Sequence, residues 1–262
     1  MKKSKKDDKK AVGVDTSALQ VAIDFSGDEG KGFEGTGKDS FAIPFLTVLQ
    51  GTSPQLHTVD GAKPGVFLNT ISGEVQSTVK VILCAYEHVY VRWAPRSAGG
   101  GYKGQVSLKD VTTNAYPNMM RHEGSIFVDV PKGQLPVDEA GKAKYDQLVD
   151  TRHHFVLHQT KAGLWTPALL SMKSTQIKHS KQWMSMANGI RLPKPGTQEL
   201  FLPPMWSHIY QLSTIAEKNE KGQWFGIAPA VVSIITDATL VRRAKEFNRS
   251  VSEGKVEATP TE

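Results

Sequence analysis

The sequence predicts a mainly β domain with a few helices, built as a small closed or partly open barrel with long loops. Three observations support this prediction. One segment near residue 80 alternates apolar and polar residues, two later segments have the pattern of hairpins, and two segments carry clear helix signals. A barrel is the natural arrangement for several hairpins in one chain, because it protects the edges of the strands.

The composition is that of a soluble globular protein whose 262 residues can bury one sizeable core. Cys84 is the only cysteine, which excludes an internal disulfide framework and a multi-cysteine zinc site. No apolar run approaches the ~20 residues of a membrane span. We therefore expect no transmembrane helix, and the lysines at the start are not followed by the apolar stretch of a secretory signal.

The net charge of +6 is unevenly distributed. Residues 1–10 carry +4 and residues 251–262 carry −2, so residues 11–250 carry only +4. Overall basicity is therefore weak support for nucleic-acid binding, although a lysine-rich segment adds non-specific affinity for phosphates. We expect a flexible lysine- and glycine-rich arm at 1–38, a single domain at 39–250 and a flexible, mildly acidic tail at 251–262.

The first half of the domain contains one long strand. Residues 41–50 form an apolar run in which Pro44 argues against a helix, so we expect an extended segment. Residues 77–94 alternate, with apolar residues at odd positions and polar or aromatic residues at most even positions, as in a half-buried strand. A glycine loop follows at 97–101. Residues 110–150 are rich in loops, with a short strand at 125–130.

The second half predicts two hairpins, each followed by a helix. The first hairpin pairs 152–160 with 164–172, and Ser174 or Thr175 can cap the following helix, which Gly189 can end. The second hairpin pairs 206–216 with 223–228. Asp237 can then cap a final helix of about a dozen residues.

One short motif resembles a phosphate-binding loop. Residues 32–38 fit G-x-x-x-x-G-K, but Asp39 stands where Ser or Thr should contact Mg²⁺. A working loop follows a buried strand and opens a helix, whereas this one follows a polar segment and precedes Pro44. We interpret it as a glycine-rich linker.

Other patterns give little support for catalysis or metal binding. His154 and His158 share a face of the predicted strand but stand about 13 Å apart, too far to bind one metal ion. We expect them and His153 on a strand surface, and Cys84 as a packed residue. No G-x-S-x-G motif is present. We expect no enzyme activity and no cofactor, and a nuclease, strand-annealing factor or nucleotide hydrolase is the third candidate function.

The even positions of residues 77–94 are the strongest candidate site. Aromatic rings alternate there with cations, which is the chemistry of single-stranded nucleic-acid binding: rings stack on bases while Lys and Arg contact phosphates. Tyrosines at alternate strand positions are also common as packed residues with a wet tip, so a purely structural role stays open. Lysines on the predicted helix after residue 174 add to the positive charge.

A set of short motifs is spread over about residues 34–235. They are Gly32, Glu34, Asp39, Ile43-Pro44, Leu46, Leu49-Gln50, Ser53-Pro54, Val91–Arg96, Gly99–Gly101, the Ser171–Trp183 block and Tyr210–Leu212 before Asn219. Taken together, these motifs resemble those of a family of phage single-stranded DNA-binding proteins. The resemblance implies an OB-like five-stranded barrel with long loop insertions. The end of the chain departs from the strongly acidic tails of such proteins, because Lys255 interrupts its glutamates.

The sequence therefore predicts a protein that coats and protects single-stranded DNA during phage replication or recombination, without a catalytic step. Its expected place is the cytoplasm of the infected bacterial host, with phage replication proteins and further copies of itself as additional partners. A phage structural, virion or protein-interaction component is the alternative function. The predicted DNA-binding residues are Lys80, Tyr86, Tyr90, Arg92, Trp93, Arg96, Tyr102, Lys103, Lys178 and Lys181.

Overall fold

The computed structural model describes residues 26–28, 31–35, 42–220, 222–256 and 258. The chain divides into two units, Met1–Gly37 and Lys38–Glu262. In the first unit, a 3₁₀ turn at Ser26–Asp28 is followed by turns at 31–35. The rest of the phosphate-loop-like motif, including Lys38 and Asp39, lies outside the described residues.

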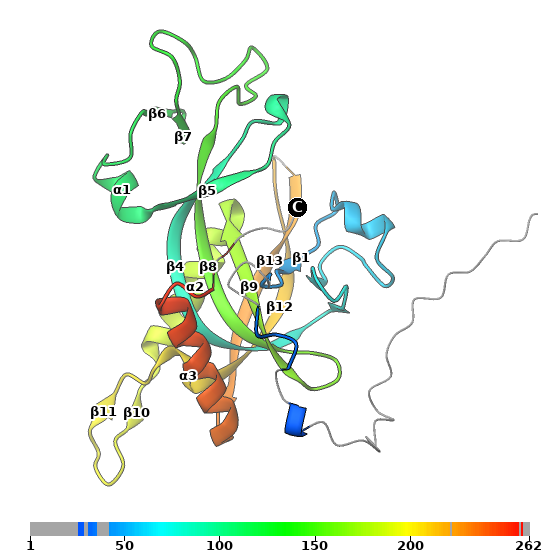
Figure 1. Ribbon diagram of the computed structural model, residues 1–262, viewed down its shortest axis with the longest axis vertical. Coiled ribbons are helices and arrows are strands. Elements are labelled where there is room, and N and C mark those ends of the chain that lie inside the picture. The colour runs from blue at the N-terminus through cyan, green and yellow to red at the C-terminus, as the bar shows by residue number, and fades with distance from the viewer. Residues whose placement is uncertain (1–25, 29–30, 36–41, 221, 257, 259–262) are drawn as a thin grey trace, which may run out of the picture. The chain divides into compact units, whose positions relative to one another are not determined.

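The second unit is built on one large antiparallel sheet (Figure 1). At its centre β4 pairs with β8 along almost the whole length of both strands. On its other side β4 pairs first with β12 and then with β5, while β8 pairs with β9 and then with β7. The strands are β4 (Val79–Trp93), β5 (Tyr102–Ser107), β6 (Met119–His122), β7 (Ser125–Val128), β8 (Gln147–Gln159), β9 (Trp165–Lys173), β12 (His208–Asn219) and β13 (Gly222–Ile234).

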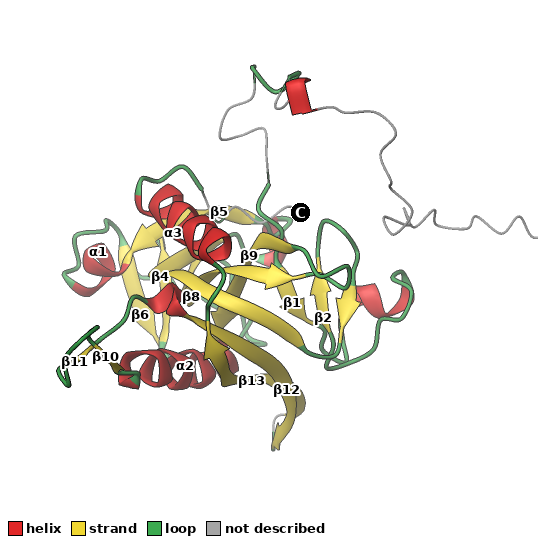
Figure 2. Ribbon diagram, turned by 90° about the horizontal axis from the view of Figure 1, so that it is seen from below, coloured by secondary structure: helices red, strands yellow, loops and turns green. Residues whose placement is uncertain are grey.

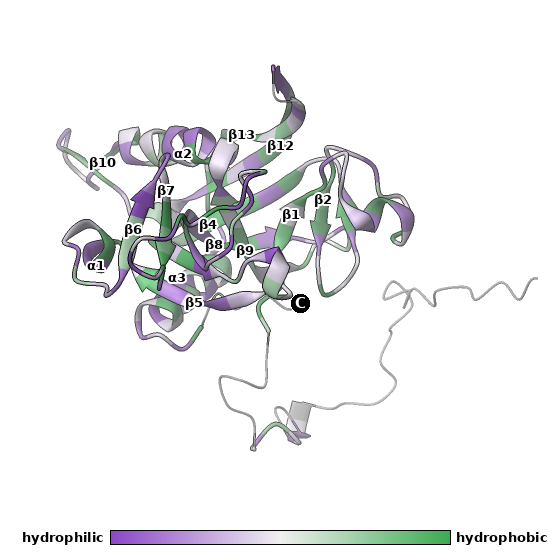
Figure 3. Cartoon of the chain, turned by 90° about the horizontal axis from the view of Figure 1, so that it is seen from above, coloured by the Kyte–Doolittle hydropathy of each residue, from purple (hydrophilic) through white to green (hydrophobic). Residues whose placement is uncertain are grey.

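Smaller elements complete the unit. Two small sheets and three helices account for most of the remaining regular structure, and green hydrophobic residues lie mostly in strands such as β1, β2 and β7 in Figure 3. These elements are β1 (Leu46–Val48), β2 (Phe67–Asn69), β3 (Val75–Gln76), β10 (Leu192–Pro193), β11 (Leu200–Phe201), α1 (Leu108–Thr112), α2 (Ile177–Gly189), α3 (Ala238–Ser252), and the 3₁₀ turns η4 (Pro54–His57), η5 (Arg96–Ala98), η6 (Ser174–Gln176) and η7 (Met205–Ser207).

The mainly β prediction is confirmed, and so are the long strand near residue 80, both hairpins and both long helices. The loop-rich prediction for 110–150 missed β6, and β5 was not predicted. Within the described residues no strand ladder joins β9 to β13, so the sheet does not close into a barrel through strand pairing. The boundary predicted at 250 falls within α3, and Ala258 is buried, with its carbonyl accepting a hydrogen bond from Gln105.

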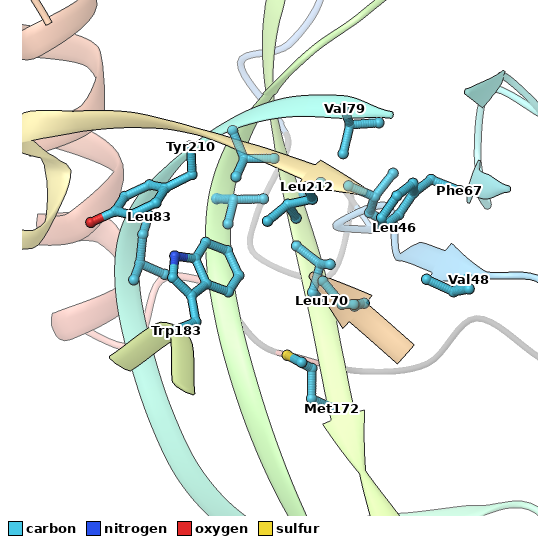
Figure 4. Packing of buried hydrophobic residues seen from close by; sticks show 14 residues of the cluster. Leu46, Val48, Phe67, Val79, Leu83, Leu170, Met172, Trp183, Tyr210 and Leu212 are labelled. Atoms are coloured by element: carbon cyan, nitrogen blue, oxygen red, sulfur yellow. The ribbon is translucent and has the colours of Figure 1, made fainter. Parts of the chain in front are cut away.

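The two long helices cover opposite faces of the central strands (Figure 2). On the face that we call the α2 face, Trp183 of α2 packs with Leu83 of β4 and Tyr210 of β12, as Figure 4 shows. On the opposite face, the α3 face, Phe247 of α3 packs edge-to-face against Phe155 of β8, with ring centroids 6.4 Å apart. Strands buried on both faces are rich in apolar residues without interruption, and residues 81–85 of β4 have this pattern.

A β-bulge at Cys84 reverses the alternation of β4. Leu83 pairs with Val156 and Ala85 pairs with Phe155, so Cys84 is an extra residue. Odd positions before the bulge and even positions after it therefore face α2. The prediction that all even positions share one face is wrong for this reason. Cys84 is fully buried, and burial raises the pKa of its thiol to about 12, which confirms it as a packed residue.

The helix ends follow two different rules. The Asp237 side chain accepts hydrogen bonds from the backbone N–H groups of Thr239 and Leu240, as predicted for a cap of α3. The cap predicted for α2 at Ser174 or Thr175 is wrong. The chain leaves β9 through the 3₁₀ turn η6, Ser174 has a φ of 52°, and α2 begins after Gln176 without a side-chain cap.

Two glutamines occupy the outer edge of β13. The Gln50 amide donates to the carbonyl of Phe225 (3.1 Å) and accepts from its N–H (2.8 Å). The Gln176 amide donates to the same carbonyl (2.7 Å) and accepts from the N–H of Ile227 (3.1 Å). Side-chain amides thus satisfy backbone groups that a further strand would otherwise pair with. We call this pair the glutamine clamp.

Gly226 in the same strand is required by close packing. His179 of α2 is buried and its ring lies directly on Gly226, so a Cβ there would stand 2.9 Å from Cε1 of the ring and closer still to Nε2. The ring cannot move easily, because its Nε2 lies 3.2 Å from Glu217 Oε2. Bonds from Lys178, His179 and Trp224 lower the pKa of Glu217 to about 2.

We expect Gly226→Ala to lower the free energy of unfolding by about 1–3 kcal/mol, because the added methyl group overpacks the contact with His179. Urea denaturation followed by tryptophan fluorescence measures this change. Gly189→Ala is the matched control, since a Cβ at Gly189 meets nothing within 4 Å. Equal stability of the Gly226→Ala variant and the wild type would show that the ring can move away.

Candidate nucleic-acid interface

Three rings stand in a row along β4 on its α2 face. Tyr86, His88 and Tyr90 are half-buried and follow the bulge at alternate positions. The rings of His88 and Tyr90 are stacked, with centroids 6.0 Å apart and an angle of 28° between their planes. Tyr86 meets the buried His154 edge-on at 5.2 Å. We call Tyr86, His88 and Tyr90 the ring row.

Arg152 of β8 fixes the ring row from the neighbouring strand. Its guanidinium donates to the hydroxyl of Tyr86 (3.1 Å) and to both carboxylate oxygens of Asp150 (2.9 and 3.1 Å). Asp150 also contacts His88 Nε2 at 2.9 Å. Burial, followed by the positive charge of Arg152, lowers the pKa of His88, and Asp150 offsets only part of this shift. His88 is therefore mainly neutral near pH 7.

Arg92 closes the same face with three side-chain bonds. Its guanidinium donates to Asp146 (2.7 Å), Asp129 (2.8 Å) and the hydroxyl of Tyr116 (3.0 Å). Burial acts to lower the pKa of Arg92, but these three bonds raise it above its ordinary value. The side chain joins β4 to Asp146, just before β8, and to the loops around residues 116 and 129. Because two carboxylates already bind it, Arg92 has little free charge for a phosphate.

The two predicted lysines of α2 have different surroundings. Lys178 forms an ion pair with Glu217 of β12. Lys181 is exposed and lies near enough to the ring row to contribute to the lowered pKa of His88. Lys181 is thus the cation that α2 supplies beside the row.

The structure places the other predicted residues elsewhere. Trp93 and Tyr102 lie on the α3 face, edge-to-face at 6.1 Å, and the ammonium group of Lys173 stands 4.8 Å from the centroid of the Trp93 ring. Lys80 precedes the bulge and is exposed on the α3 face of β4. Arg96 and Lys103 are exposed on the loop and strand beyond Trp93.

The ten predicted residues therefore do not form one surface. The α2 face brings together Tyr86, Tyr90, Arg92 and Lys181, and it adds His88, Arg152 and Asp150, which were not in the predicted set. Arg152 stands at the start of the predicted strand 152–160 and directly opposite His88, so correct pairing of the two strands was the signal that identifies it. Sequence alone gave no means of placing the bulge.

The histidine cluster is part of the core, and its expected place on a strand surface is wrong. His153, His154 and His158 are at most 2% exposed, because both faces of β8 are covered. His154 Nε2 lies 2.8 Å from Ser180 Oγ, and His158 Nε2 lies 3.1 Å from the Asn69 amide. Neither ring nitrogen of His153 has a partner among the described residues. In that part of the chain no three His, Cys, Asp or Glu side chains gather as metal ligands.

These features define a class of β-sheet protein with an aromatic and polar surface on one face of its central strand. Residues 14–257 match the family described as Pam3 phage gp34-like protein, and the chain belongs to this family. The match makes it a phage-type protein. No curated protein and no solved structure matches the chain. In the described residues, no helix is both long and apolar enough to cross a membrane.

The buried histidines predict a loss of stability in acid. Burial lowers the pKa of His153 from 6.5 to about 4 in the folded chain. Between these two values the unfolded chain binds a proton that the folded chain excludes, so stability is complete above pH 6.5 and falls as the pH drops toward 4. For His153 alone, the loss in the free energy of unfolding amounts to at most roughly 3 kcal/mol.

We expect His153→Phe to reduce this dependence, which His154 and His158 with their lowered pKa values retain in part. The variant should not lose stability at pH 7, because the ring nitrogens of His153 have no partner among the described residues. Urea denaturation of both proteins at several pH values between 4 and 7 tests this. Ser171→Ala, at the neighbouring position of β9, removes no titrating group and should keep the wild-type slope. A His153→Phe protein with an unchanged slope would contradict the assignment.

Proposed function

We propose that this protein binds single-stranded DNA during phage replication or recombination and acts without a catalytic step. The observation that carries this proposal is the ring row of Tyr86, His88 and Tyr90. Alternate positions of a strand are about 6.6 Å apart, so three rings follow one line along β4. Rings arranged in this way can stack on successive bases, and stacking does not depend on base identity.

The charged groups around the ring row mostly bind one another, so they orient the rings more than they attract DNA. Arg92 and Arg152 are bound to Asp129, Asp146 and Asp150, so their charges are largely balanced. Lys181 is the exposed cation beside the row. We propose that Lys181 contacts phosphate, while Arg152 holds Tyr86 directly and His88 through Asp150. With Lys181 as the one proposed phosphate contact, this surface relies on stacking and has a weaker salt dependence than is usual for single-stranded DNA-binding sites.

We also propose that the central strands correspond to an OB-like barrel with long insertions. Strands β9, β8, β4, β12 and β13 are five neighbours in one curved sheet. Residues 44–50 run between its two outer strands: the N–H of Leu169 in β9 donates to Pro44 (2.9 Å), and Gln50 binds Phe225 in β13. This segment supplies the contacts that would bring β9 and β13 together.

A structural or protein-interaction role in the phage is the second candidate. It is favoured by an apolar patch near the end of β13, where Val231, Val232 and Ile234 are 43%, 48% and 46% exposed. Contiguous exposed apolar residues commonly mark a surface that meets another protein. A titration of the wild-type protein with poly-dT distinguishes the two functions. Absence of tryptophan quenching and of a gel shift with poly-dT at low salt would reject DNA binding and leave the interaction role.

We expect Tyr86→Leu to weaken binding of poly-dT by about 5- to 150-fold, which corresponds to the ~1–3 kcal/mol of one base stacked on a ring. A fluorescence titration at low salt measures the affinity. Tyr145→Leu is the matched control, because Tyr145 is a half-buried tyrosine whose hydroxyl bonds to Gln134 outside the ring row. Equal losses in the two variants would remove the ring row from the proposed site.

We expect Lys181→Ala to lower the slope of log affinity against log salt by about 0.7, the value for one phosphate contact on a single strand. Lys178→Ala removes the same charge from the same helix, but its ammonium group is already paired with Glu217. The control slope should therefore stay close to that of the wild type. Titrations with poly-dT at several salt concentrations give both slopes, and identical slopes would contradict the role of Lys181.

A further inference from the structure

A second candidate surface lies over the outer side of α3. A pocket of about 620 Å³ opens where the turn η7 meets α3. Trp206 of η7 is half-buried at one wall, and the other wall is the polar side of the helix. The lining residues are Trp206, Arg242, Lys245, Glu246, Asn248, Arg249, Ser252 and Glu253. We call this pocket the α3 groove.

The helix holds three cations in one line along the groove. Arg242, Lys245 and Arg249 are spaced three and four residues apart, so they share one side of α3 over about 10 Å of its length. The opposite side of the helix is anchored in the core by Leu240, Ala244, Phe247 and Val251. The packing of these four residues therefore fixes the part of the backbone that carries the three cations.

The carboxylates of the described residues balance the charge of these cations only in part. Among the described residues, none of Arg242, Lys245 and Arg249 has a carboxylate within ion-pair distance. Glu253 is bound by Lys255, which with Arg249 nearby lowers the pKa of its carboxyl group. Glu246 is the other carboxylate that lines the groove. Three exposed cations thus face one unpaired carboxylate.

Asn248, one of the residues that line the groove, already forms a side-chain hydrogen bond. The Asn248 amide donates to the carbonyl of Cys84 at 2.8 Å, which ties α3 to the bulge of β4. The groups free to meet a ligand are therefore the indole of Trp206 and the three cations. A flat ring beside a line of cations suits an aromatic base that carries phosphate, since the ring stacks and guanidinium groups bind phosphate oxygens in pairs.

We propose that the α3 groove binds a nucleotide unit, with its base against Trp206 and its phosphates on Arg242, Lys245 and Arg249. This goes beyond the proposed function, because the groove lies on the face of the sheet opposite the ring row and involves none of its residues. The same chemistry is offered by a segment of a DNA strand and by a free nucleoside triphosphate. The experiment below distinguishes these two sources.

The test compares the full chain with Arg242→Ala/Arg249→Ala by fluorescence anisotropy. One probe is a labelled thymidine oligonucleotide, and the other is a fluorescent nucleoside triphosphate. Alanine keeps the helix, so circular dichroism should show the same folded content. Lys132→Ala/Lys142→Ala also removes two positive charges, from exposed positions outside the groove, and serves as the control. Lys245→Ala is a milder second variant in the groove.

We expect the groove variant to bind the oligonucleotide at least tenfold more weakly than the wild type and the control do. Loss of oligonucleotide binding alone identifies a DNA strand as the ligand, and a parallel loss of triphosphate binding identifies the free nucleotide as well. Wild-type affinity of the groove variant for both probes, or failure of the wild type to bind either, would overturn the inference. If Tyr86→Leu loses binding while the groove variant keeps it, only the groove is rejected. The reverse result rejects only the ring row.

Discussion

The long antiparallel pairing of β4 with β8, with its one extra residue at Cys84, determines which side chains meet on each face of the protein. Residues 81–85 of β4 and 153–158 of β8 are buried on both faces, so the alternation of these strands cannot shift without exposing a row of apolar side chains. The bulge moves Ala85 to the α3 face and Tyr86 to the α2 face. Without it, the ring row would lie on the α3 face, which now carries Ala85, Glu87, Val89 and Val91.

The same double coverage explains the unusual polar residues of the core. His153, His154 and His158 lie in the stretch 153–158 of β8, where every residue is buried. Two of them are accommodated by Ser180 and Asn69, whereas His153 keeps two ring nitrogens without partners in the described structure. Neutral histidines can be buried at moderate cost, which is why their protonation and the stability of the fold are linked.

The sequence was sufficient for features that depend on local pattern. Alternation around residue 80, the glycine turn near Gly163 and the cap at Asp237 each predicted an element that the structure contains. Features that depend on pairing over distance were out of reach. Nothing near Cys84 indicates a bulge, and nothing near His153 shows that both faces of its strand are covered. Arg92 is similar, because its partners Asp129 and Asp146 come from residues far along the chain.

The candidate surfaces show the same division. Tyr86 and Tyr90 could be found from the sequence, because they are rings at alternate positions of one strand. The sequence could not show that the predicted residues are divided between two faces of the sheet. The spacing of Arg242, Lys245 and Arg249 in the sequence places them on one side of a helix. That spacing did not indicate a binding site until the structure placed Trp206 beside them. Tyrosine and arginine are ambiguous in sequence because both serve equally well in a surface network and at a ligand.

The glutamine clamp has a consequence for how copies of this chain can associate. A strand edge with free backbone groups is a template on which other chains can polymerise. Gln50 and Gln176 occupy that template at Phe225 and Ile227, and Pro229 offers no N–H at the next outward-facing position. Growth of a continuous intermolecular sheet from the middle of β13 is thus blocked by two side chains and a proline. The residues around Val231 at the end of the strand carry no such side-chain cap, so assembly through that part of the edge is limited to a short contact rather than a fibre.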